Sequence, residues 1–313
     1  MNLKRVPLFC ILFLTAMLIC GCRTAFSDLN GAAEQNSDNN QSGSEQTDKP
    51  FFQYELLGYR IVSGRQGTAY DGGFYYVSGT DSLTKYDKDF NVVSENRQPF
   101  EGVDIQVNHL GDIDVHGGKL YAGIEWFEGG KAKHPAIAIY DAESLKLRRV
   151  FTLAEESGQT EISGITYDTD RNMIWTVSWQ TGESGANLYG YSEENCACVD
   201  KIKMLNPPYH SQGVKYRDGV FYLTADDGNA SNNEPDHLYR AQIAAGNKEA
   251  KVTLEKSFDD MADLGEIEGL TFDHQNRLYV IHNRGYHVSY GIIDGYDRGY
   301  NTEISEMYCY ELK

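Results

Sequence analysis

The sequence predicts an all-β fold, a five-bladed β-propeller made of four-stranded antiparallel blades. Three observations support it: a two-stranded unit recurs five times, its spacing is that of propeller blades, and helical periodicity is almost absent after the N-terminal segment. The equivalent positions of the five units are separated by 45, 52, 49 and 56 residues. These positions are Gly67, Asp112, Gly164, Gly213 and Gly269.

Each unit has a short alternating strand, a tight polar turn and a second strand rich in aromatic and β-branched residues, which is the pattern of a β-hairpin. The turns carry the Gly, Asp and Asn residues that hairpins need. The units are QGTAYDGGFYYVSG (66–79), GDIDVHGGKLYAGIEW (111–126), SGITYDTDRNMIWTVSW (163–179), QGVKYRDGVFYLTADDG (212–228) and EGLTFDHQNRLYVIHNRG (268–285).

A third strand is expected after every hairpin, and a fourth after every unit except the last. The spare apolar segment FFQYELLGYRIV, which begins at Phe51, can fill the vacant place in the last blade. The N-terminal strand would then close the ring and protect an open sheet edge. The propeller domain is therefore expected to span residues 51–313.

The N-terminus is expected to be a targeting segment rather than part of the fold. Residues 1–21 combine a basic start with a short apolar run, as in a signal peptide, and ICGC resembles a lipobox that ends at Cys22. We expect cleavage before Cys22 and lipidation of its thiol, although an ordinary signal peptide or an uncleaved anchor remains an alternative. Residues 22–50 are polar and nearly free of large apolar side chains, which predicts a disordered tether.

The formal net charge of −18 argues against nucleic acid or an anionic lipid surface as the main partner. It suits a monomeric domain held on the extracytoplasmic side of the cell membrane by its N-terminal lipid. Beyond the lipobox, the cysteines are Cys196, Cys198 and Cys309, and they form no zinc-binding pattern. Free thiols and a disulfide to Cys309 both remain open.

Charged and polar residues are expected to meet at one mouth of the central channel. The loop that enters each inner strand and the loop that leaves its neighbour lie on the same face of a propeller, because the two strands are antiparallel. His274, in a hairpin turn, falls on the opposite face. Two residues before the entry position lie His109, Glu161, His210 and Glu266. The next layer and the walls of the mouth comprise Gln66, Ser163, Gln212, Glu268, Trp126, Trp179 and Arg284.

Two kinds of site fit this set. The first is a divalent metal, zinc or calcium, held by His109, Glu161, His210 and Glu266. The second is a small-molecule site in which Glu266 or Glu268 acts as an acid or base, the tryptophans form apolar walls and Arg284 pairs with an anionic group. The plain alternative is that these polar residues line a watery channel.

Two loops are further candidates. The acidic, Asn-rich loop 224–237 can be a calcium loop or a solvated connection, and it lacks the spacing of a calcium motif. The Tyr-rich loop 285–303 is expected to be a lid, a binding surface or simply a packed insertion.

Parts of three units resemble known propeller families. QGTAYDGGFYYVSGTDSLTKYD is similar to the first blade of the five-bladed plant-type glutaminyl cyclases. EIEGLTFDHQNRLYVIHN resembles the Glu-Gly-Leu entries of SdiA-regulated propellers and esterase-like phytases. HLGDIDVHGGKLYAGIEW is similar to soluble calcium-activated nucleotidases, which hold calcium on the ring axis. The resemblance covers most of residues 60–313, but His109 and His210 depart from the nucleotidase pattern, so no catalytic residue is carried over.

Three functions are consistent with the sequence. The first is a tethered lipoprotein that binds a small molecule or a metal ion at the channel mouth. The second is an enzyme, either a metal-assisted hydrolase or a glutaminyl-cyclase-like acyl transferase. The third is a protein-interaction scaffold.

Overall fold

In the computed structural model, residues 49–243 and 246–313 are described. The predicted signal peptide, Cys22 and the tether as far as residue 48 lie outside this range. The described residues form β-strands and two short 3-10 helices, Glu155–Ser157 and Ala230–Asn232. Among the described residues, no helix is long and apolar enough to cross a membrane.

The first two sheets are four-stranded antiparallel meanders in which each strand pairs with the next along the chain. Their hairpin turns use paired glycines with positive φ, such as Gly72 (56°) and Gly73 (88°), where a side chain would be strained. The first sheet contains β2 (Gly67–Asp71), β3 (Phe74–Gly79), β4 (Ser82–Tyr86) and β5 (Val92–Asn96). The second contains β6 (His109–His116), β7 (Lys119–Glu128), β8 (Lys131–Asp141) and β9 (Leu147–Thr152).

The next eight strands form one continuous sheet of order β10-β11-β12-β13-β17-β16-β15-β14. All its pairings are antiparallel except a short parallel one between β13 and β17, over Lys203–Leu205 and Glu249–Lys251. The strands are β10 (Gly164–Asp168), β11 (Met173–Val177), β12 (Asn187–Ser192), β13 (Cys198–Leu205), β14 (Ser211–Arg217), β15 (Val220–Ala225), β16 (His237–Ile243) and β17 (Glu249–Ser257).

The last four-stranded sheet joins the two ends of the described chain. Its order is β1-β22-β19-β18, and β1 pairs antiparallel with β22 from Tyr54 opposite Leu312 to Ile61 opposite Glu306. This is the closing N-terminal strand that the sequence predicts. The strands are β1 (Tyr54–Ile61), β18 (Glu266–Phe272), β19 (Arg277–Arg284) and β22 (Ile304–Leu312).

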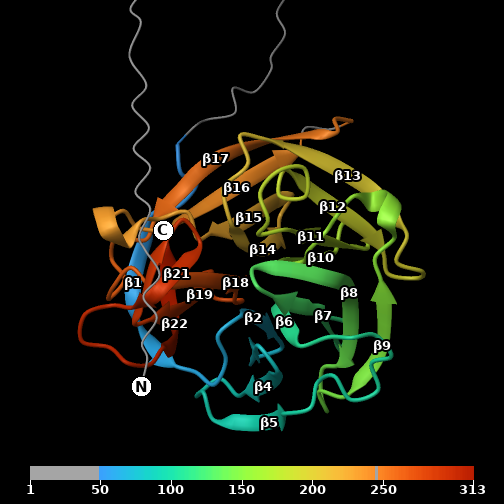
Figure 1. Cartoon of the computed structure of the whole chain (residues 1–313), viewed down its shortest axis with the longest axis horizontal. Helices are drawn as coiled ribbons and strands as arrows, with labels where there is room; N and C mark the ends of the chain where they lie inside the picture. Colours follow the sequence, from blue (N-terminus) through green and yellow to red (C-terminus); the bar gives the residue numbers. More distant parts are fainter. Residues whose placement is uncertain (1–48, 244–245) are drawn as a thin grey trace, which may run out of the picture. The chain divides into compact units, whose positions relative to one another are not determined.

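The sheets surround a common centre, with β2, β6, β10, β14 and β18 innermost (Figure 1). Each of these inner strands contacts the next, and β18 contacts β2, so the inner ring is closed. Backbone hydrogen bonds tie neighbouring sheets together: Gly269 N–H donates to Gln66 O at 2.8 Å, and Asp112 N–H donates to Ser163 O at 2.9 Å.

Apolar clusters fill the spaces between the sheets. The cluster that includes Val62, Val77, Tyr279, Ile281 and Met307 joins the last sheet to the first. Burial of these side chains stabilises the closure of the ring, at about 1.5–3 kcal/mol for each large side chain. The structure thus has the all-β architecture of a β-propeller, built from three antiparallel four-stranded sheets and one mainly antiparallel sheet of eight strands.

The Tyr-rich segment after Arg284 is not an irregular loop. It forms a separate two-stranded hairpin of β20 (Tyr286–Ser289) and β21 (Ile292–Tyr296). Cys196, Cys198 and Cys309 are free thiols.

Candidate functional site

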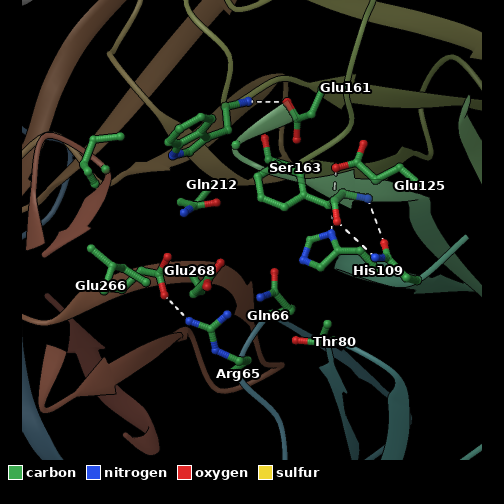
Figure 2. Close-up of a pocket in the computed structure, with 17 residues that line it drawn as sticks. Arg65, Gln66, Thr80, His109, Glu125, Glu161, Ser163, Gln212, Glu266 and Glu268 are labelled. Carbon is green, nitrogen blue, oxygen red and sulfur yellow. Dashed lines mark hydrogen bonds and ion pairs between the residues drawn. The ribbon is translucent and has the colours of Figure 1, made fainter. Parts of the chain in front are cut away.

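A cavity of about 370 Å³ lies where the inner strands begin. Side chains from all parts of the ring point into it (Figure 2). Its lining comprises Arg65, Gln66, Thr80, Asn108, His109, Glu125, Phe127, Gly130, Glu161, Ser163, Trp179, Gln212, Glu266, Glu268, Gly291, Ile292 and Ile293.

Most of the residues predicted for the channel mouth meet in this cavity. They come from the entries of the inner strands and from the end of β11, as antiparallel pairing requires. Local irregularities aid this convergence, because pairing shifts occur near the starts of β6, β14 and β18. Such bulges bend a strand and redirect its side chains. The predicted residues in the lining are Gln66, His109, Glu161, Ser163, Trp179, Gln212, Glu266 and Glu268.

Three predicted residues do not line the cavity. Trp126 pairs with Lys133 in the part of the β7–β8 ladder that follows a shift in register after Ile124. The Arg284 guanidinium donates to the buried Glu306 carboxylate at 2.6 Å and lies over two tyrosine rings. The His210 ring packs against Trp179 in a tilted arrangement, with 4.5 Å between ring centroids and 43° between the ring planes, and it lines a separate side cavity.

The predicted metal ligands do not converge on one point. Among residues 49–243 and 246–313, no group of three or more His, Cys, Asp and Glu side chains is placed to hold a metal ion. Glu266 instead forms an ion pair with Arg65, and Glu161 accepts the Trp179 backbone N–H at 2.6 Å. These partners occupy carboxylate oxygens that a metal would need.

Sequence reasoning missed Arg65, Glu125 and Phe127 as lining residues. Arg65 directly precedes Gln66, which enters the first inner strand, so its position in the repeat could have predicted a place at the mouth. Glu125 and Phe127 are two positions apart on β7 and therefore share one face, whereas Trp126 between them points to the other face. Only the first face lines the cavity.

One wall of the cavity carries a pair of buried carboxyl groups, Glu125 and Glu161, which are 1% and 3% exposed. Burial, and then the nearby Glu125 carboxylate, raise the pKa of Glu161 well above its usual value. Glu125 accepts the Ile162 N–H at 3.2 Å. Beside this pair, the His109 ring contacts Phe127, and its Nδ1 lies 3.7 Å from a Glu125 carboxylate oxygen, too far for a hydrogen bond.

The opposite wall carries a second pair, Glu266 and Glu268. Arg65 pairs with Glu266 and also donates to Glu303 at 2.9 Å. Glu268 is 2% exposed and accepts a 3.2 Å hydrogen bond from the Asn283 side-chain amide. Burial, and then the charge of Glu266, raise the pKa of Glu268 well above its usual value. Carboxyl groups with a strongly raised pKa are common at functional sites.

An aspartate closes the centre of the ring beneath these pairs. The five equivalent positions hold four glycines and Asp112, and the Asp112 carboxylate lies in the space that side chains on Gly67 and Gly269 would fill. It accepts the Ile113 N–H at 2.9 Å and the Val214 N–H at 3.2 Å. Burial raises the pKa of Asp112 well above its usual value. The carboxyl group therefore blocks the channel at this level.

A further buried acid lies behind Glu266 and Glu268. Asp226 follows β15 and has no exposed surface, and neither carboxylate oxygen has a hydrogen-bond partner among the described residues. Burial, then Asp236, Glu266 and Glu268, raise the pKa of Asp226 well above its usual value. Burial likewise raises the pKa of Asp236 to about 8. Burial therefore disfavours the ionised form of both acids.

The β20–β21 hairpin covers part of the cavity, to which its tip contributes Gly291, Ile292 and Ile293. The acidic loop 224–237 holds this tip: Tyr290 N–H donates to Gly228 O at 2.7 Å. In addition, Ser289 pairs with Asn229, and their side chains hydrogen-bond at 3.0 Å. In the structure this loop therefore supports the hairpin.

Comparison with known proteins supports the fold alone. No protein-family model and no curated protein matched the chain. Among solved structures, xylan β-1,4-xylosidase from Bacillus halodurans C-125 is similar with a TM-score of 0.53 and 14% identity, over 80% of this chain and 53% of that one. A protein of unknown function from Bacteroides thetaiotaomicron has a TM-score of 0.47 and 14% identity, over 84% of this chain and 74% of that one. A gluconolactonase from Xanthomonas campestris has a TM-score of 0.44 and 13% identity, over 80% of this chain and 72% of that one. The chain has a β-propeller-type fold.

Proposed function

We propose that the protein is a lipid-anchored, extracytoplasmic propeller that binds a small polar ligand in the cavity at the channel mouth. The lining of the cavity carries this proposal. It combines four buried carboxyl groups, an arginine, a histidine and two glutamines with aromatic walls in about 370 Å³. Ligand sites in proteins have this character, a concave apolar surface with a few convergent polar groups.

We further propose that the ring has five blades. In this interpretation the eight-stranded sheet is two blades, β10 to β13 and β14 to β17. Each half is an antiparallel meander that begins with an inner strand. Among the described residues, strand pairing between the halves is confined to the short parallel contact of their outermost strands. Three further four-stranded sheets complete the count. An experimentally determined structure of the domain would test this number directly.

The lipid anchor rests on the lipobox ending at Cys22 and on the polar segment that follows it. A lipid on that residue would hold the propeller at the membrane surface. Intact-mass measurement of the protein from membranes tests this part. A diacylglycerol-modified chain starting at Cys22 is expected, and an unmodified N-terminus at any other residue would contradict it.

Ligand binding is tested by a thermal-shift screen of small polar molecules, with the cavity variant Gln212→Leu as the control. A true ligand raises the melting temperature of the wild-type protein and not of the variant, since only ligand bound to the folded state stabilises it. If every stabilising compound acts equally on both proteins, the cavity is not the binding site.

A second candidate function is enzymatic. The raised pKa values of Glu161 and Glu268 favour it, because a buried acid beside a substrate-sized cavity is a typical general acid or base. Turnover of a bound ligand that is lost in both Glu161→Gln and Glu268→Gln would establish this function. Unchanged ligand after prolonged incubation would leave binding as the sole role.

A further inference from the structure

We infer that the ligand is an organic cation, an ammonium group attached to an apolar or aromatic body. This inference rests on the proposed function, since it names the chemical class that the same cavity selects. It begins from the charges that line the cavity. Among the described lining residues, four are carboxylic acids, and Arg65 is the one Lys or Arg.

Arg65 does not neutralise this set of acids. Its guanidinium pairs with Glu266 on the cavity wall and with Glu303 outside the lining. Glu125, Glu161 and Glu268 have neutral donors as their hydrogen-bond partners: the Ile162 N–H, the Trp179 N–H and the Asn283 amide. The one other basic side chain of the described lining, His109, lies 3.7 Å from Glu125 and can offset at most one of these acids.

Burying a carboxylate without a compensating cation costs several kcal/mol. Each of these three groups is at most 3% exposed. They are stable as buried acids only when protonated or when a cation lies beside them. A ligand cation that enters the cavity supplies positive charge that Arg65 and His109 cannot provide for all four acids.

The shape of the site favours an organic cation over a metal ion. The carboxyl pairs lie on opposite walls, with Gln66 and Gln212 between them (Figure 2), and no three acidic or histidine side chains of the described residues converge as a metal requires. Trp179 and Phe127 line the cavity, and aromatic rings of this kind attract ammonium groups. Ile292 and Ile293 of the hairpin tip provide apolar surface for the rest of the ligand.

Proton release is the expected signature of this binding. An ammonium group beside Glu268 stabilises its ionised form, so a carboxyl that is protonated in the free protein loses its proton when the amine binds. The charged and titratable groups that act on Glu268 are Glu266 on the same strand, Arg65 before β2, Asp112 on β6 and Asp226 after β15. Those that act on Glu161 include Glu125 on β7.

The test compares three probes of nearly the same shape, benzylamine, benzyl alcohol and benzoate, by titration calorimetry on the full chain in detergent. We expect benzylamine to bind at least about tenfold more tightly than benzyl alcohol, equivalent to about 1.4 kcal/mol, and benzoate not to bind. The benzylamine enthalpy should depend on the ionisation enthalpy of the buffer, because protons are released. Glu268→Gln should weaken benzylamine binding and reduce the proton release, whereas Glu194→Gln, an exposed site outside the cavity, should change neither.

The possible results separate the inference from the proposed function. Tighter binding of benzyl alcohol or benzoate than of benzylamine, or binding of calcium or zinc chloride alone, would overturn the cation class and leave a ligand site at the mouth. Equal loss of benzylamine binding in Glu268→Gln and Glu194→Gln would also overturn the class, because the effect would not belong to the cavity. Failure of all three probes and both metals would count against both the class and the site.

Discussion

The Asp112 carboxylate occupies the space that a side chain on Gly269 would need, at the centre of the inner ring. Four glycines bring the inner strands close together, and the fifth equivalent position supplies the one side chain that fills the remaining space. Packing therefore determines the residue type at these positions: glycine where strands approach closely, and aspartate at the one position where a side chain fits.

Gly269→Ala is therefore expected to destabilise the protein by several kcal/mol. The new methyl group would overlap the Asp112 carboxylate and approach the Cα of Gly67 within 2.7 Å, and a packed centre relaxes little. Chemical denaturation measures the change. Gly79→Ala is the matched control, because its methyl group would meet mainly the Ser82 hydroxyl, which can rotate away. Equal losses in the two variants would contradict the role of the central packing.

Glu268→Gln is expected to stabilise the ligand-free protein as the pH rises. The folded-state pKa of Glu268 is raised above its unfolded value of about 4.3, so the wild-type carboxyl favours folding at low pH and loses this contribution as it ionises inside the fold. Glutamine does not ionise. The difference in melting temperature between variant and wild type should grow from pH 4 upward, and a difference that shrinks with pH would contradict the buried-acid assignment.

Trp179→Leu is expected to weaken benzylamine binding about 5- to 30-fold, because an aromatic face beside an ammonium group contributes about 1–2 kcal/mol. Trp126→Leu is the matched control, because the repeat predicts both tryptophans at the channel mouth but only Trp179 lines the cavity. Calorimetry on the two variants distinguishes the two positions. Equal weakening by both substitutions would contradict the placement of the aromatic wall.

Gly291→Ala is expected to displace the hairpin tip and to speed ligand release. Its methyl group would lie 2.7 Å from the His210 ring and 2.9 Å from the Trp179 indole nitrogen. Gly295→Ala controls for backbone strain, because Gly295 also has a positive φ, 82° against 71°, and its methyl group would meet open space. Stopped-flow dissociation rates compare the two, and equal rates would show that the tip does not cover the ligand.

Much of the fold could be predicted from the sequence because propeller hairpins carry local signals. The turn glycines and the alternating strands lie within single repeats. The spare strand before the first repeat and the missing fourth strand of the last one together predict the pairing of β1 with β22. The repeat also placed His109, Glu161, Glu266 and Glu268 at one mouth, since antiparallel pairing decides the face.

What the sequence could not supply was the direction and partner of each side chain. Arg284 does not line the cavity because its guanidinium pairs with Glu306, which lies on β22 after the hairpin insertion. Trp126 does not line the cavity, and it lies just after a shift in the pairing of β7 and β8. Arg65 enters the site through an ion pair with Glu266, 201 positions away in sequence. Such contacts arise only when the ring closes.

A crystal structure of the protein soaked with benzylamine tests the central claim most directly. We predict that the amine nitrogen lies within hydrogen-bond distance, about 2.7–3.2 Å, of a carboxylate oxygen of Glu125, Glu161 or Glu268, with the ring beneath the β20–β21 tip. An amine bound elsewhere on the molecule while the cavity stays without it would contradict the account.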